Sequence, residues 1–439
     1  MKSATQQPDN TNTLKKLSTA LLYLAIFIQW VMLFLISWRE LPFSFAWKIE
    51  DWSFSRSRVI ATKIDQHGEP WLIADTTGND IYQLRHVTKD GTVSWDLPFL
   101  TLEDAIFTSI LQDQNNNPWL ILGKRLAHWD GNQWNFTPMP LDADIKDVIP
   151  PTVVIKDAMV WGIDMTPDKH RIIKLDLNQD PIQAGEILLP DGLESQQYKF
   201  NCIISTPSGL LAVLSNEEQV AIYQLQDDKW QRITSFVRNK QASNVFVSDV
   251  AIDSKDQIWV LLQSRPALEK PVGRYDPIEK RWIWLGLEQP EHNIRFLEYG
   301  HIAFDAFDRV WLFYDEYGTT FDFISSSLFH SYVIGVYEEI PDDKLALVRY
   351  YSSRNSSLQT SSLSRIAIGP DGKIWTWNQQ LVWMDGNQKE LPKPLPNWFI
   401  FLTENKILLL IVSIILLVVY IFVQVRIQKY KLAGLAKKE

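Results

Sequence analysis

The hydrophobic pattern shows two long apolar runs, one near each end of the chain, separated by short apolar stretches that alternate with polar turns. The first run covers residues 17–38 and contains no charged side chain. The second, Ile407–Val423, carries polar side-chain atoms only at Ser413 and Tyr420. Because a helix rises about 1.5 Å per residue, about 20 apolar residues cross a hydrocarbon core of about 30 Å. The pattern therefore predicts transmembrane helices over residues 17–38 and 404–425.

Basic residues lie on the terminal side of each predicted helix. They are Lys15, Lys16, Arg426, Lys429 and Lys431. Cytoplasmic flanks of membrane helices carry an excess of Lys and Arg. Residues 1–16 and 426–439 are therefore expected to be cytoplasmic tails, with residues 39–397 on the opposite side of the membrane.

A cleavable signal peptide is the alternative for the first run, but no small-residue cleavage site follows it at Ile36–Arg39. The single cysteine, Cys202, excludes an intrachain disulfide. A disulfide-free domain outside the cytoplasm is compatible with a bacterial inner membrane. Together these features predict a double-pass inner-membrane protein.

The middle of the chain is repetitive. Its units share an apolar strand, Asp-x-x-(Gly/Asn/Asp), two further residues, a Trp and a second apolar strand. Five good copies begin at Ile64, Leu111, Ile252, Phe304 and Ile368. Two weaker copies cover residues 155–161 and 206–212, and Ala212 replaces the Trp in the second of these. We number these repeats one to seven along the chain.

Each conserved element of the motif has a physical reason. The turn aspartates are Asp65, Asp113, Asp253 and Asp305, and the marker tryptophans are Trp71, Trp119, Trp161, Trp259, Trp311 and Trp375. An aspartate can accept hydrogen bonds from the turn backbone, and Gly, Asn or Asp three residues later tolerates a positive φ. The Trp offers a large flat side chain to fill the space between sheets. Because these residues recur once per unit, we interpret them as structural and not catalytic.

The repeat length predicts the fold. Successive markers are 42 to 64 residues apart, which is typical of a propeller blade. A second aromatic hairpin in several units, for example residues 128–134, completes four strands per blade. We expect an all-β, seven-bladed propeller over residues 39–397, closed by a strand near residues 46–54 that pairs with the last blade. The Ser-rich residues 351–364, in the longest interval, are expected to form an exposed insertion.

The Asp-x-x-Gly-x-(Leu/Ile/Val)-Trp unit with its aromatic hairpin resembles the repeat of two-component regulator propellers. It is also similar to the streptogramin lyase type of seven-bladed propeller. The resemblance covers about residues 55–390 and implies a fold more than a function. Sensor members of the family continue into a histidine kinase, but only 14 residues follow residue 425. We therefore expect no kinase domain.

A few residues are candidates for chemical sites. Asp113–Asn117 has the spacing of half a calcium loop but lacks the later bidentate carboxylate. The seven histidines form no His-x-x-x-His or His-x-His pair, and His301, at the start of an inner strand, is the one candidate. Cys202 lies in an apolar strand and is interpreted as a core residue. The sequence thus predicts no catalytic, cofactor-binding or metal-binding residue.

These features favour a membrane-anchored module that binds a small molecule or a protein as a sensor or scaffold. Two alternatives remain open: a propeller lyase or hydrolase that uses channel-facing His and acidic residues, and a structural subunit of a membrane complex. The net charge of -9 argues against a nucleic-acid partner. No cofactor is expected.

Overall fold

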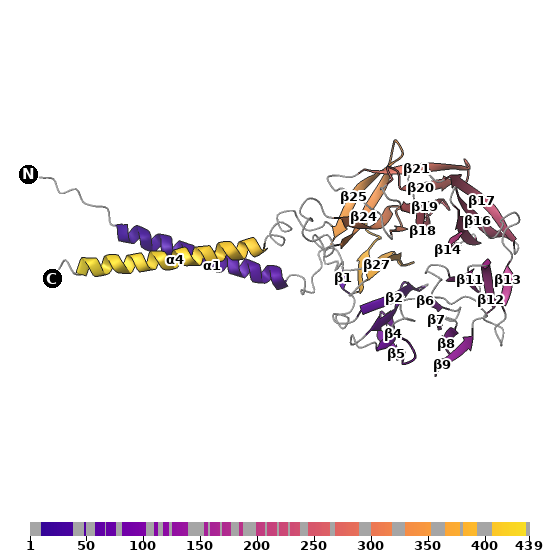
Figure 1. Cartoon of the computed structure of the whole chain (residues 1–439), viewed down its shortest axis with the longest axis horizontal. Coiled ribbons are helices and arrows are strands. Elements are labelled where there is room, and N and C mark those ends of the chain that lie inside the picture. The colour runs from indigo at the N-terminus through magenta and orange to yellow at the C-terminus, as the bar shows by residue number, and fades with distance from the viewer. Residues whose placement is uncertain are drawn as a thin grey trace, which may run out of the picture. The chain divides into compact units, whose positions relative to one another are not determined.

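The computed structural model has two units, one with two helices and one with all the strands (Figure 1). It describes residues 10–37, 48–49, 58–65, 67–75, 81–101, 109–112, 117–122, 125–138, 153–156, 159–166, 169–176, 184–187, 199–206, 209–216, 219–226, 229–237, 245–263, 268–288, 300–317, 330–352, 365–377, 381–392 and 406–435.

The helical unit consists of α1 (Asn10–Ser37) and α4 (Lys406–Leu435), which pack antiparallel. Their contact surface includes small and polar residues: the Ser413 hydroxyl lies 3.4 Å from the Ala25 carbonyl oxygen, and Gln424 donates a hydrogen bond to the Ser18 hydroxyl at 3.0 Å. Small residues let helix backbones approach closely in an apolar medium. Gln29, the polar residue of the first apolar run, is exposed.

Large apolar side chains cover the outside of this helix pair, with Phe27 64% and Phe422 73% exposed. Among the described residues, Ile411–Lys429 is long and apolar enough to cross a membrane, while the apolar stretch of α1, Lys16–Val31, is shorter. The structure therefore supports one candidate membrane span, in α4. The spanning role of α1 stays a prediction.

The regular elements described in the second unit are all strands. In chain order they are β1 (Lys48–Ile49), β2 (Arg58–Ile64), β3 (Pro70–Asp75), β4 (Tyr82–Thr88), β5 (Gly91–Asp96), β6 (Ser109–Gln112), β7 (Pro118–Leu122), β8 (Arg125–Trp129), β9 (Trp134–Pro138), β10 (Val153–Lys156), β11 (Met159–Thr166), β12 (Lys169–Asp176), β13 (Ala184–Ile187), β14 (Lys199–Thr206), β15 (Gly209–Ser215), β16 (Gln219–Gln226), β17 (Lys229–Val237), β18 (Phe246–Ile252), β19 (Ile258–Gln263), β20 (Val272–Asp276), β21 (Arg281–Glu288), β22 (His301–Phe304), β23 (Val310–Tyr317), β24 (His330–Ile340), β25 (Lys344–Ser352), β26 (Arg365–Ile368), β27 (Lys373–Trp377) and β28 (Leu381–Asp385).

These strands form antiparallel meanders. Five sheets have four strands each: β2 to β5, β6 to β9, β10 to β13, β14 to β17, and β1-β28-β27-β26. In an eight-stranded sheet, two further meanders, β18 to β21 and β22 to β25, are joined where β21 runs parallel to β25. The first strand of each meander contacts that of the next, and β26 contacts β2. This propeller-like arrangement (Figure 1) confirms the predicted all-β class.

The N-terminal strand of this unit pairs with the last meander. Lys48 lies opposite Trp383 and Ile49 opposite Val382. This strand lies inside the segment 46–54, from which the sequence predicted closure. The pairing adds a fourth strand, from the start of the chain, to β26–β28.

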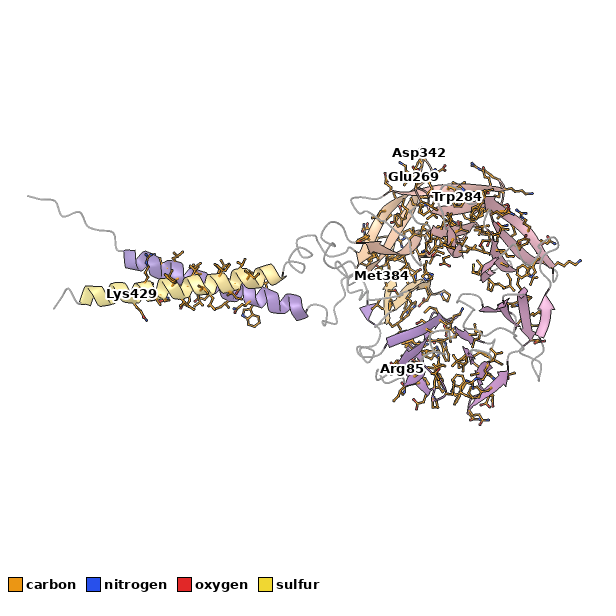
Figure 2. All side chains as sticks on the ribbon, in the orientation of Figure 1. Arg85, Glu269, Trp284, Asp342, Met384 and Lys429 are labelled. Carbon is orange, nitrogen blue, oxygen red and sulfur yellow. The ribbon has the colours of Figure 1, made fainter. Side chains whose placement is uncertain are left out.

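The core lies between neighbouring sheets. Each marker Trp is at most 6% exposed, and Ala212 is fully buried in the place of the missing one. Met384 on β28, labelled in Figure 2, belongs to one apolar cluster with Trp311 on β23. Trp375 on β27 packs with Leu72 on β3 in another. Side chains of two successive sheets therefore share each cluster.

The Ser-rich segment differs in part from the expectation. Tyr351 and Ser352 belong to β25, and Tyr351 is fully buried with its hydroxyl donating to the Pro392 carbonyl at 2.7 Å. The long strands β24 and β25 thus account for part of the longest repeat interval. Residues 353–364 lie outside the described residues.

Candidate functional site

The turn between the first two strands of a repeat is built around its aspartate. In repeat five, one carboxylate oxygen of Asp253 accepts hydrogen bonds from the backbone N–H groups of Lys255 and Gln257, both at 2.9 Å. Asp256, three residues after Asp253, has φ +57°. The backbone therefore takes the left-handed conformation at the position where the motif has Gly, Asn or Asp.

The second oxygen of this aspartate binds the marker tryptophan. The indole N–H of Trp259 donates to Asp253 at 2.9 Å, and that of Trp311 donates to Asp305 at 2.8 Å. Both aspartates are buried. Both oxygens of Asp253 and of Asp305 accept hydrogen bonds from residues of the same repeat. These two aspartates therefore have a structural role.

A third position completes this arrangement: the residue opposite the Trp on the next strand. Opposite the markers lie His86, His128, Lys174, Arg274 and Trp383. The two histidines stack on the indole, Lys174 and Arg274 place a cation over its face, and the ring of Trp383 is tilted against that of Trp375. The sequence motif does not include this position, although His128 opens the aromatic hairpin of residues 128–134.

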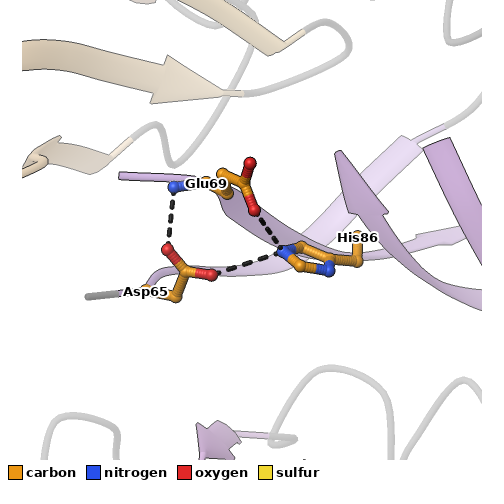
Figure 3. A group of neighbouring side chains, drawn as sticks. All are labelled: Asp65, Glu69 and His86. Atoms are coloured by element: carbon orange, nitrogen blue, oxygen red, sulfur yellow. Dashed lines mark hydrogen bonds and ion pairs between the residues drawn. The ribbon is translucent and has the colours of Figure 1, made fainter. Parts of the chain in front are cut away.

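In repeat one, the turn aspartate contacts the residue opposite the Trp, which is His86. His86 stacks on Trp71 with a centroid separation of 4.0 Å, and its Nε2 atom lies 3.3 Å from both Asp65 Oδ2 and Glu69 Oε2. Figure 3 shows the two carboxylates pointing at this nitrogen from the two ends of the β2–β3 turn. The indole N–H of Trp71 is buried without a hydrogen-bond partner.

The electrostatics of this cluster depend on the protonation of His86. Burial lowers the pKa of His86, while the carboxylates of Asp65 and Glu69 act in the opposite direction. Asp65 is buried, and the Glu69 side chain is 25% exposed. Within the described part of the chain, this is the group of three side chains that could hold a metal ion.

His301, the histidine singled out from the sequence, belongs to a second His–carboxylate pair. Its Nδ1 atom lies 3.3 Å from Asp249 Oδ2, which also accepts the backbone N–H of Ile302 at 3.0 Å. The other oxygen of Asp249 accepts the N–H of Val250. The carboxylate thus links β18 to β22, the first strands of two successive repeats.

Cys202 stands near this pair on β14. The thiol is buried, and both burial and the charge of Asp249 raise its pKa above the ordinary value. A nucleophilic cysteine needs a lowered pKa, because the thiolate is the reactive form. Cys202 therefore remains a protonated core residue and does not complete a Cys–His site.

Other predicted positions are only partly described. Asp113 and the rest of the calcium-like segment through Asn116 lie outside the described residues. Lys16 is exposed on α1, and Arg426 is exposed on α4. Lys429 is exposed on the same helix (Figure 2). Lys15 and Lys431 lie within the helices α1 and α4. The helix α4 thus continues beyond residue 425, through the expected start of the basic tail.

No family model matches the chain, and no curated protein matches it in sequence. Solved structures with a similar chain path include the extracellular domain of a protein assigned as a one-component system in B. thetaiotaomicron, with 13% identity and a TM-score of 0.46. That match covers 77% of this chain and 40% of the other. A chain of the mitotic checkpoint complex matches with 9% identity, a TM-score of 0.44, and coverage of 77% and 91%. A protein assigned as a 6-phosphogluconolactonase in Bacteroides uniformis has 10% identity, a TM-score of 0.40, and coverage of 73% and 88%. Similarity this distant assigns neither an activity nor a ligand.

Proposed function

We propose that this protein is a seven-bladed β-propeller anchored in a bacterial inner membrane, and that the propeller binds a small molecule or a protein as a sensor or scaffold. Both termini lie in the cytoplasm and the propeller lies outside it. The observation that carries the binding role is that the turn aspartates Asp253 and Asp305 are hydrogen-bonded within their own repeats. These carboxylates stabilise the fold and are therefore not available as catalytic groups.

The blade count is supported by the contacts between first strands, which run from β2 through β6, β10, β14, β18, β22 and β26 and return to β2. The eight-stranded sheet contributes two blades, because it consists of two four-stranded meanders whose last strands, β21 and β25, pair in parallel. Closure by β1 brings the two ends of the propeller chain together in the last blade. A helix at each end can then enter the same patch of membrane.

Membrane anchoring is supported by the apolar outer surface of the α1–α4 pair. In water such a surface would be costly, because exposed apolar area carries about 25 cal/mol per Å². The basic residues Arg426 and Lys429 are exposed on α4, and Lys16 is exposed on α1. In an antiparallel pair these residues lie at the end that holds the two termini, which favours a cytoplasmic location for that end.

Binding is favoured over catalysis because the described Asp249 and Cys202 side chains are not available for acid–base or nucleophilic chemistry. Asp249 is committed to a backbone link between two strands, and the Cys202 thiol is held in its unreactive form. A general acid or base must be free to reach a substrate proton. His301 alone does not make a reaction centre.

The test is purification of the intact protein from its native membrane in mild detergent, followed by mass spectrometry. The proposal expects either a stoichiometric partner or a small molecule that raises the melting temperature of the purified chain. Replacing both helices with unrelated membrane helices should separate a partner held by the membrane segments from one held by the propeller. Turnover of a substrate that is abolished by His301→Gln, with the melting temperature unchanged, would contradict the binding role.

A further inference from the structure

A positive charge stands beside the marker Trp in repeats three, five, six and seven, whereas repeat two has a histidine, His128, stacked on its marker. In repeat six, Arg309 donates from Nε to Asp305 Oδ2 at 2.6 Å. In repeat five the guanidinium of Arg274 lies 5.6 Å from the centre of the Trp259 ring, and in repeat seven Lys373 lies 5.7 Å from that of Trp375. These cations are permanent at neutral pH.

Repeat one lacks a permanent cation at this position. Glu69 stands where Gln257, Arg309 and Lys373 stand in repeats five, six and seven, and His86 stands where repeat five has Arg274. With a neutral imidazole, the cluster carries the two negative charges of Asp65 and Glu69. Repeat one therefore presents an excess of negative charge where repeats five, six and seven place a cation.

Backbone hydrogen bonds fix the orientation of the two carboxylates. Asp65 Oδ1 accepts the backbone N–H groups of His67 and Glu69, and Glu69 Oε1 accepts that of Lys89 at 3.3 Å. Each carboxylate thus uses one oxygen for the backbone and directs the other to His86. Hydrogen bonds of this kind orient metal ligands in proteins.

The spacing of these atoms suits a tetrahedral ion. Around Zn²⁺, with bonds of about 2.0–2.1 Å to N and O, neighbouring ligand atoms lie about 3.3–3.4 Å apart. His86 Nε2 lies 3.3 Å from each of the two carboxylate oxygens. The three ligand atoms all lie within 4.8 Å of one another.

One buried atom of this cluster, His86 Nε2, has no hydrogen bond of acceptable geometry and can serve as a ligand. The indole N–H of Trp71 is also unpaired, but so are those of the markers Trp119 and Trp375, so this feature does not distinguish repeat one. In repeats five and six the corresponding indole N–H is bound by the turn aspartate. In repeat one, Asp65 Oδ2 is directed to His86 instead.

We propose that Asp65 Oδ2, Glu69 Oε2 and His86 Nε2 bind a divalent transition-metal ion of the Zn²⁺ class. One nitrogen and two oxygen donors suit such an ion better than Ca²⁺ or Mg²⁺, which prefer oxygen alone. The partly exposed Glu69 leaves a route for the ion and a fourth position for water. The site is independent of the proposed binding role, which requires no metal.

The test uses the untagged full chain in detergent, stripped with a chelator and titrated with Zn²⁺ alone. We expect one bound ion per chain, a higher melting temperature with Zn²⁺, and a visible absorption band when Co²⁺ is used instead. Glu69→Gln and His86→Gln should each weaken Zn²⁺ binding at least tenfold.

Glu339→Gln is the matched control, because Glu339 also contacts a cationic side chain, Arg274, at 2.9 Å but lies outside the cluster. Its Zn²⁺ affinity should stay within about twofold of wild type. If His86→Gln fails to fold, Glu69→Gln decides alone, since Glu69 is partly exposed and the amide keeps its shape. No metal bound by the wild type, or binding unchanged in Glu69→Gln, would overturn the proposal.

Discussion

Asp305 illustrates how one side chain can organise a repeat. One of its oxygens accepts hydrogen bonds from two backbone N–H groups of the turn. The other accepts hydrogen bonds from the side chains of Trp311 and Arg309. Arg309 is buried and also donates to three backbone carbonyl oxygens in the last repeat, those of Gly386, Gln388 and Lys389. A single carboxylate therefore fixes a turn, a core tryptophan and the arginine that ties repeat six to repeat seven.

Asp305→Ala should lower the free energy of unfolding by about 3–5 kcal/mol, because it leaves the buried Arg309 charge without its partner. Unfolding by denaturant, followed by tryptophan fluorescence, measures this loss. Asp90→Ala, at an exposed hairpin position, is the control and should cost at most about 0.5 kcal/mol. Equal effects of the two substitutions would refute the structural role of the motif aspartate.

The helices α1 and α4 meet along a narrow seam, in which Ser18, Ala25, Ser413 and Ile427 are nearly fully buried. Ala25 and Ser18 lie seven residues apart, two turns of the same helix face. Other apolar residues of these helices point outward. The seam is thus defined by small residues and not by the largest ones.

A double variant, Ala25→Cys with Ser413→Cys, tests this seam. Since the two residues are in contact, oxidation of membranes should link the helices, so that two fragments cut within the β unit remain joined on a gel. Ala20→Cys with Ser413→Cys is the control, because Ala20 is exposed on the same helix. Efficient linkage of the control pair alone would show that the helices pack through another face.

The sequence predicted the turn and the Trp of repeats five and six because these residues lie within about ten positions of one another. The positive φ of Gly68, Asp256, Asp308 and Gly372 follows from the residue types at those places. The stacking of His86 on Trp71 could not be predicted in this way. It depends on strand register between β3 and β4, which a hairpin loop sets and a short motif does not record.

The carboxylate cluster in repeat one was missed for the same reason. Asp65 was interpreted as structural because it recurs in other repeats, and its backbone hydrogen bonds match those of Asp253 and Asp305. What distinguishes it is the pair Glu69 and His86, which are 17 positions apart in the chain. Both differ from the residues at the equivalent positions of repeat five, two before the Trp and opposite the Trp.

At the scale of the whole molecule, the arrangement depends on joining the two ends of the β unit. Two contacts do this: the pairing of β1 with β28, and the packing of Trp375 and Leu381 against Leu72 and Ala74. The first is a short backbone ladder and the second an apolar cluster. Closure therefore has a hydrogen-bonded part and a hydrophobic part that can be tested separately.

The double substitution Lys48→Pro and Ile49→Pro removes both backbone N–H groups of β1. It should weaken the pairing of β1 with β28 that closes the β unit. We expect the melting temperature to fall by roughly 3 °C or more relative to the double Ala variant, since 1 kcal/mol corresponds to about 2–4 °C in a domain of moderate size. The Ala variant loses the same side chains but keeps its N–H groups. Identical melting temperatures would mean that β1 contributes nothing to closure.

The most direct test of the membrane-anchored propeller is the side of the membrane on which its parts lie. Cys202 is buried, so the wild type gives a low background with a membrane-impermeant maleimide. Lys89→Cys, in the exposed β4–β5 hairpin, should be labelled on intact spheroplasts, while Lys429→Cys, near the end of α4, should be labelled only after lysis. Labelling of both positions from the same side would contradict the account.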